Sequence, residues 1–263
     1  ELDAAILFSD ILTIPDSFGL GVEFIEKEGP VFRNPISKST DIKNLNHFDP
    51  ESLDYVYKAV NNIKSSLPKE IPLIGFCGSP WTLAAYSIEG RSSKDFEKTL
   101  SFLESNQKDV HDLLKKYTDA CFLYLRRQVQ SGADVIQIFD SWANLLTKED
   151  LIEFSFNYIN SLISALKLDP ITKNIPVIIF ARNPKCNIEE LINTSADCIS
   201  LFWSMNDLNF EVAKNKVAIQ GNLDPKILLE SDETIKRETY KILERFKEYP
   251  GYIFNLGHGI TPD

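Results

Sequence analysis

The sequence alternates between short apolar runs and amphipathic stretches, and this alternation constrains the fold more than any other feature. Continuous runs of Val, Ile, Leu and Phe are typical of strands that are buried on both faces of a parallel sheet, and the amphipathic stretches between them are typical of covering helices. Seven such strands are predicted, near residues 4–9, 71–77, 134–139, 175–181, 197–203, 216–221 and 252–257. No repeat, linker or low-complexity tract divides the chain, so we predict one α/β domain over residues 1–263.

Capping signals predict where several of the helices begin. Asp49-Pro50 predicts a helix that reaches about residue 67, and Thr147 begins a capping-box sequence that opens a helix to about residue 167. Two successive helices are predicted over residues 93–132. Single helices are predicted over 187–194, 205–214 and 231–248. Residues 20–33 alternate in the manner of a small hairpin, which we expect to lie over the mouth of the fold.

The number of strands leaves two architectures open. A closed (β/α)8 TIM barrel needs eight strands and about 250 residues, whereas an open doubly wound sheet accepts seven strands. The chain has no initiator Met and opens inside a strand-like run. We therefore favour a barrel whose first strand is missing from this segment, and we expect the catalytic domain to be incomplete at both ends.

Composition excludes several classes of function. The net charge of −10 and the pI near 4.9 argue against non-specific nucleic-acid binding. No apolar run is long enough to cross a membrane, and the first residues are not a signal peptide. The four cysteines are scattered without zinc-ligand spacing, so we expect no metal site and a reduced, cytoplasmic protein.

Polar and glycine clusters follow the apolar runs directly, and functional groups in α/β barrels lie beyond the carboxyl ends of the strands. Asp10 ends the first run, Tyr86 follows the second within a helix, Ser141 ends the third, and His258 lies between two glycines after the last. Asp10 either caps a turn or stabilises a developing cation, and Tyr86 is either a core residue or a donor to a cavity. Ser141 belongs to no nucleophile elbow, and His258 is the histidine placed best for function.

The residues alone therefore predict a barrel that binds a small polar ligand, and they leave the reaction open. The other histidines, His47 and His111, are interpreted as surface residues without partners. The glycines follow no dinucleotide or phosphate-loop spacing, which disfavours nucleotide binding.

Residues 8–12, 75–90, 137–143, 220–225 and 255–260 together closely resemble the uroporphyrinogen decarboxylase family. The blocks Gly-Ser-Pro-Trp-Thr-Leu and Asn-Leu-Gly-His-Gly are the most specific, and the likeness spans the chain in the right order. The resemblance implies a homodimeric barrel without cofactor or metal that removes the four acetate carboxyls of uroporphyrinogen to give coproporphyrinogen. It also implies that Asp10 stabilises a pyrrole cation and accepts the pyrrole N–H groups, while Tyr86, Ser141 and His258 hydrogen-bond the substrate.

The sequence departs from the family pattern in three places. The arginine-rich segment with which the family begins is absent, the family's Leu-Asp-Trp is replaced by Leu201-Phe202-Trp203, and the terminal helix expected after Pro262-Asp263 is missing from this segment. Two alternatives stay open. A zinc-dependent corrinoid or thiol methyltransferase shares the barrel, but Cys77 has no histidine two residues before it. A non-catalytic tetrapyrrole-binding relative is the other.

Overall fold

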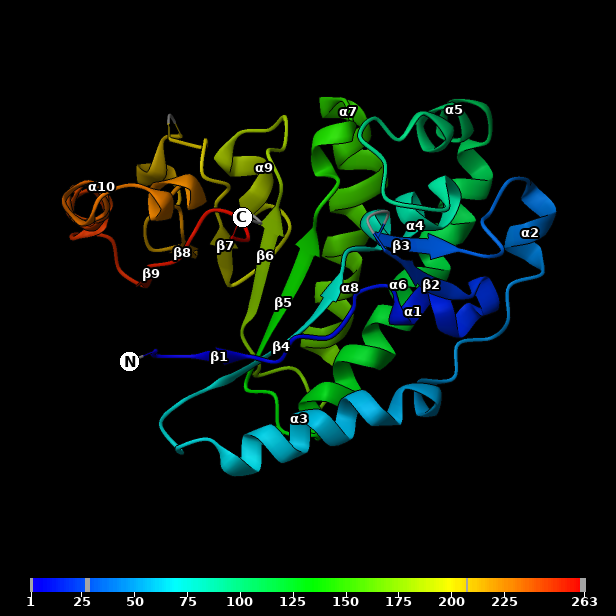
Figure 1. Cartoon of the computed structure of the whole chain (residues 1–263), viewed down its shortest axis with the longest axis horizontal. Coiled ribbons are helices and arrows are strands. Elements are labelled where there is room, and N and C mark those ends of the chain that lie inside the picture. Colours follow the sequence, from blue (N-terminus) through cyan, green and yellow to red (C-terminus); the bar gives the residue numbers. More distant parts are fainter. Residues whose placement is uncertain (1, 27–28, 207, 261–263) are drawn as a thin grey trace.

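A parallel sheet of seven strands forms the centre of the computed structural model, which describes residues 2–26, 29–206 and 208–260 (Figure 1). Its strands, in spatial order, are β1 (Ala5–Ile6), β4 (Leu73–Gly78), β5 (Val135–Asp140), β6 (Val177–Ala181), β7 (Cys198–Ser200), β8 (Ala218–Gln220) and β9 (Tyr252–Ile253). Each neighbouring pair is parallel. All seven predicted strands are confirmed, and the outer ones are shorter than the sequence indicates.

The strand order identifies the class of α/β fold. Each strand of the sheet lies beside the one that precedes it in the chain, apart from the separate hairpin β2 (Val22–Ile25) and β3 (Gly29–Phe32). A doubly wound sheet reverses its order at a switch point, whereas a barrel adds strands in sequence. The sheet is therefore a curled, half-closed (β/α) barrel, and within the described residues β1 and β9 form its two edges.

The longer helices cover one face of this sheet, as Figure 1 shows for α3, α6 and α8. The α-helices are α1 (Thr13–Pro15), α2 (Ser39–Lys43), α3 (Asp54–Ser66), α4 (Pro80–Glu89), α5 (Glu97–Ser105), α6 (Gln107–Gln130), α7 (Lys148–Asp150), α8 (Asn157–Leu168), α9 (Ile188–Ile192) and α10 (Asp232–Phe246). Shorter turns of helix are η1 (Asp16–Leu20), η2 (Pro50–Leu53), η3 (Ala143–Leu145), η4 (Leu151–Phe156), η5 (Phe210–Val212) and η6 (Pro225–Leu229). Asp49 and Thr147 cap helical segments as predicted. No helix in the described part of the chain is long and apolar enough to cross a membrane.

The helix predicted over 205–214 is wrong, because the described residues of this range form only the short turn η5. The side-chain oxygen of Asn206 accepts hydrogen bonds from Asn222 Nδ2 (3.3 Å) and Arg245 Nη1 (3.0 Å). Asn215 then adopts a left-handed conformation with φ of 63°. These tertiary hydrogen bonds replace the local ones of a helix, and a sequence pattern does not contain them.

Helix α6 is joined to β4 by a side-chain amide. Gln128 donates from Nε2 to Phe76 O (2.9 Å) and accepts from Phe76 N (3.0 Å). A side chain at Gly75 would place its Cβ 2.7 Å from the amide oxygen of Gln128, so this approach requires glycine. The Gln128 amide occupies the backbone groups of Phe76, and the β1–β4 pairing ends at Ile74.

At the amino ends of the strands the same hydrogen-bonding arrangement occurs twice. Asp134 accepts hydrogen bonds from Leu73 N (2.7 Å) and Lys64 Nζ (2.6 Å). Asp197 does the same with Val177 N (2.7 Å) and Lys167 Nζ (2.6 Å). In each case the carboxylate lies just before one strand and accepts from the first N–H of the strand that precedes it in the chain. It also pairs with a lysine near the end of the helix that connects to that region. This face of a barrel contributes to stability rather than to chemistry.

Replacing Asp134 by alanine should lower the free energy of unfolding by about 1–2 kcal/mol, because the N–H of the buried Leu73 loses its partner. Lys64→Ala is the matched control, since it removes only a partly exposed ion pair and should cost less than about 1 kcal/mol. Urea unfolding of both variants measures the difference. Equal destabilisation by the two substitutions would contradict the importance of the Leu73 hydrogen bond.

Candidate active site

Two adjoining cavities open at the carboxyl ends of the strands. The first, of about 390 Å³, is lined by Asp10, Tyr86 and Ser141 together with the hairpin residues Phe24 and Pro30. The second, of about 1010 Å³, extends into the concave face of the sheet. Its lining includes Gln137, Phe180, Ser200, Gln220 and His258. Phe139 and Ser141 line both cavities and therefore mark where they meet. The structure thus brings three of the four predicted residues into one cavity and places His258 in its neighbour.

Asp10 follows β1 and is half-buried. Its Oδ1 accepts a hydrogen bond from Leu12 N (2.8 Å), so one carboxylate oxygen stabilises the turn that enters α1. Within the described residues Oδ2 has no hydrogen-bond donor and remains available to a ligand. The two interpretations of Asp10, turn cap and site carboxylate, therefore apply to different oxygens of the same side chain.

Tyr86 lies on α4, a helix that is buried along nearly its whole length. Its ring packs edge-on against Phe96 and Trp142, with centroid distances of 5.8 and 5.6 Å. Burial raises the pKa of the Tyr86 hydroxyl, so the group stays neutral and able to donate a hydrogen bond near physiological pH. Trp81, on the same helix, donates from Nε1 to Trp142 O (3.0 Å) and fixes α4 to the loop after β5.

The carboxylate of Asp140 lies behind this wall and is fully buried at the end of β5. It accepts hydrogen bonds from Ser79 Oγ (2.9 Å), Thr82 Oγ1 (3.0 Å) and Ser155 Oγ (2.5 Å). Ser79 is also the N-cap of α4, where its hydroxyl accepts from Thr82 N (3.0 Å). Burial raises the pKa of the Asp140 carboxyl, and the hydroxyl donors oppose that rise. Asp140 therefore joins β5, α4 and η4 directly beneath Ser141.

His258 lies between two aromatic rings that come from β6 and the loop after β7. Its imidazole meets Phe180 and Phe202 edge-on, with centroid distances of 6.3 and 5.9 Å. A Cβ at Gly257 would lie 2.5 Å from Trp203 Cα, so glycine is required for the chain to approach Trp203 and present His258. Phe202, which stands where the resemblance places an aspartate, supplies an apolar contact to His258 instead of a hydrogen bond.

The sequence analysis missed two residues of this region. Asp140 was not proposed as a functional residue, although it is a buried acceptor for three hydroxyls. Arg182 was not singled out, and its Cζ lies 5.4 Å from the ring centroid of Trp142. The available signal was its position, because Arg182 follows β6 directly, just as Ser141 follows β5.

The four cysteines are free, and Cys77, Cys121 and Cys198 are buried. Burial raises the pKa of Cys186 and Cys198 to about 12. It also raises the pKa of Cys121, which lies against Cys77. Among the described residues, no three His, Cys, Asp or Glu side chains gather in an arrangement that would hold a metal ion.

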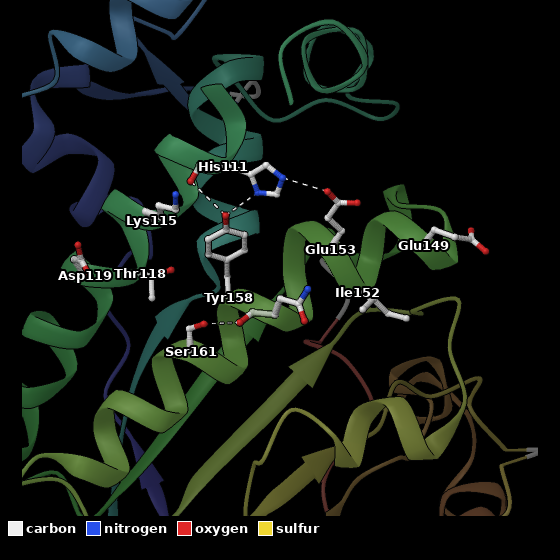
Figure 2. A pocket seen from close by; sticks show the side chains of 10 residues that line it. His111, Lys115, Thr118, Asp119, Glu149, Ile152, Glu153, Tyr158 and Ser161 are labelled. Carbon is white, nitrogen blue, oxygen red and sulfur yellow. Dashed lines mark hydrogen bonds and ion pairs between the residues drawn. The ribbon is translucent and has the colours of Figure 1, made fainter. Parts of the chain in front are cut away.

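A separate hollow lies on the outer helical surface between α6 and the η4–α8 segment (Figure 2). There His111 Nδ1 lies 2.7 Å from Tyr158 Oη and Nε2 lies 3.2 Å from Glu153 Oε1. The expectation that His111 has no partners is therefore wrong, since these partners come from helices that the sequence does not show to be neighbours. The hollow lies among outer helices and includes none of the polar residues that follow the strands, so we do not assign the active site to it.

Comparison with known proteins points to one family. The chain matches the family model described as uroporphyrinogen decarboxylase (URO-D) over residues 1–263. It is 46% identical over 265 residues to the uroporphyrinogen decarboxylase of Vesicomyosocius okutanii, with 100% of this chain and 76% of the relative covered. It is 45% identical to that of Pseudoalteromonas atlantica, with 100% and 75% covered. The chain thus spans about three quarters of the length of these relatives.

Solved structures resemble the fold at much lower identity. A methyltransferase from Methanosarcina mazei matches with a TM-score of 0.72 and 18% identity, over 99% of this chain and 76% of that one. A B12-independent methionine synthase from Shewanella sp. matches with a TM-score of 0.53 and 14% identity, over 92% and 68%. At such identities the likeness concerns the barrel fold alone.

The raised pKa of Asp140 predicts a pH dependence of stability. In the folded state Asp140 holds its proton above its ordinary pKa of 3.8, whereas the unfolded chain releases it there. Raising the pH through this window therefore favours unfolding, and the free energy of unfolding should fall relative to that of the Asp140→Asn variant, which has no proton to lose. Denaturant unfolding between pH 4 and pH 8 measures both curves. Asp232→Asn, at the exposed start of α10, is the control and should follow the wild-type curve. Parallel curves for wild type and Asp140→Asn would contradict the pKa shift.

Proposed function

Because the chain belongs to the uroporphyrinogen decarboxylase family, we propose that the two cavities at its strand ends are where its substrate binds and reacts. The family membership makes the chain a carboxy-lyase of tetrapyrrole biosynthesis, which removes the acetate carboxyls of uroporphyrinogen to give coproporphyrinogen. The observation that carries the assignment of the site is that Asp10, Tyr86 and Ser141, which follow three different strands, line one cavity.

The reaction requires a group that accepts an electron pair. When CO2 leaves an acetate side chain, the electrons of the broken C–C bond must move into the pyrrole ring, and protonation of a ring carbon makes the ring able to accept them. The resulting cation is stabilised by a nearby carboxylate in a pocket that excludes water. We assign this role to Asp10, whose free Oδ2 also provides an acceptor for pyrrole N–H groups.

Three further residues bind the substrate in this proposal. Tyr86 donates a hydrogen bond from its neutral hydroxyl, and Ser141 donates where the two cavities meet. His258 binds from the larger cavity, with Phe180 and Phe202 limiting its movement. The polar floor of that cavity, where Gln220 Nε2 donates to Ser200 Oγ (3.1 Å), provides further hydrogen-bonding groups beneath the substrate.

The two alternatives receive less support. The methyltransferase interpretation rests on a fold likeness at 18% identity, whereas the named decarboxylases share 43–46% with the chain. A purely tetrapyrrole-binding role is less well supported, because the relatives that share 45–46% identity with the chain are named as decarboxylases. We therefore retain the decarboxylase assignment.

We also propose that the protein acts as a cytoplasmic homodimer without a cofactor, as the family resemblance implies. The exposed apolar side chains of Phe8, Phe24 and Ile260 lie at the cavity mouths and support an association that shields them. Sedimentation equilibrium of the full-length protein should give twice the monomer mass. A mass equal to that of the monomer at micromolar concentration would contradict the dimer.

Replacing Asp10 by asparagine should lower kcat by about 100-fold or more, because the substitution removes the charge opposite the developing cation and keeps an oxygen that can accept from Leu12 N. Formation of coproporphyrinogen by the full-length protein is the measurement. Asp16→Asn is the matched control, since Asp16 accepts from Val22 N (2.8 Å) and does not line the Asp10–Tyr86–Ser141 cavity. Unchanged turnover in Asp10→Asn would refute the role given to Asp10.

A further inference from the structure

The pairing of β5 with β6 places Arg182 beside Ser141. Phe139 pairs with Phe180 and Asp140 with Ala181, so Ser141 and Arg182 come next in the same register. The ladder continues beyond the strands, because Arg182 N donates to Asp140 O (2.9 Å). Side chains two residues apart lie on the same face of a sheet. Phe180 lines the larger cavity, so the alternation places Arg182, the first residue after β6, on the same side of the sheet as that cavity.

The guanidinium of Arg182 is held against the wall of the site. Its Cζ lies 5.4 Å from the ring centroid of Trp142, the residue directly after Ser141. Its charge also acts on Tyr86, where burial raises the hydroxyl pKa and the positive charge of Arg182 partly opposes that rise. Packing against a flat ring restricts the guanidinium and leaves its edge, with its N–H donors, open to a partner.

Arg182 has no acidic partner within the described residues, whereas other arginines do. Arg33, Arg126 and Arg237 each form an ion pair, with Glu23, Asp169 and Glu238 respectively. The chain carries 38 acidic and 28 basic residues, so an arginine that finds no carboxylate stands out. Because a half-buried charge without a partner is unfavourable, this guanidinium is placed for a negative charge that the described residues do not supply.

We propose that Arg182 binds a carboxylate of the substrate, and specifically one that the reaction leaves in place. The proposal rests on the function proposed above. Decarboxylation converts a carboxylate into neutral CO2, so a guanidinium bound to the departing group would stabilise the ground state more than the transition state and slow the reaction. A guanidinium bound to a carboxylate that stays improves affinity and orients the ring without that cost.

The test compares three variants of the full-length protein. Arg182→Gln removes the charge, Arg182→Lys keeps a charge over Trp142 but loses the planar fork, and Arg237→Gln is the control on the outer helix α10. For uroporphyrinogen we expect KM to rise about tenfold or more in Arg182→Gln and by a smaller factor in Arg182→Lys, with kcat within about threefold of wild type. Arg237→Gln should leave both constants unchanged. A KM for Arg182→Gln equal to that of Arg237→Gln would overturn the proposal.

Binding of the product, coproporphyrinogen, identifies the carboxylate without requiring turnover. If Arg182 holds a carboxylate that remains, Arg182→Gln weakens the binding of product and of substrate by similar factors. Weakened substrate binding with unchanged product binding would overturn the assignment to a retained carboxylate. A wild-type protein that forms no coproporphyrinogen would instead refute the proposed function, and the titrations would still report on Arg182. Unfolding curves of the variants verify that each one is folded.

Discussion

The buried carboxylate of Asp140 is the interaction on which the geometry of the site depends. Its three hydroxyl partners come from the start of α4 and from η4, and the carboxylate itself ends β5. Tyr86 lies on α4 and Ser141 follows Asp140, so their relative position is set by these hydrogen bonds and by the hydrogen bond from Trp81 to Trp142 O. A buried polar group of this kind is costly unless every donor is placed correctly. The same requirement fixes the position of α4 relative to β5, because a shift of α4 would leave the carboxylate of Asp140 without its donors.

The two ends of the sheet have different tasks. At the amino ends, Asp134 and Asp197 join strands to helices by ion pairs and backbone hydrogen bonds that face away from the cavities. At the carboxyl ends, Asp10 and Arg182 each keep hydrogen-bonding groups that the described protein atoms do not satisfy. The ion pairs at the amino ends therefore stabilise the sheet without using the groups proposed for binding, which stay uncommitted at the carboxyl ends.

The sequence predicts what local patterns determine and misses what tertiary contacts determine. All seven strands are apolar runs, and Asp49 and Thr147 carry their capping signals in their immediate neighbours, so these elements were predictable. The helix predicted over 205–214 is absent because Asn206 hydrogen-bonds to Asn222 and Arg245, which are distant in sequence. Arg182 was missed for a related reason. Its place beside Ser141 depends on the register of β5 against β6, and no single-sequence pattern fixes that register.

The protein is acidic and its substrate carries many carboxylates, so their net charges repel each other. The charged and polar groups at the site must be placed so that they offset this repulsion. The proposed site distributes its groups across four neighbouring strands: the carboxylate of Asp10 after β1, the hydroxyls of Tyr86 and Ser141 after β4 and β5, and the guanidinium of Arg182 after β6. A tetrapyrrole carries N–H donors toward its centre and carboxylates at its rim. An acceptor at one end of this series and a cation at the other therefore match the centre and the rim of a single ring system. In the proposed site, this order of charges along the strands, rather than the net charge of the chain, accounts for the binding of a polyanion.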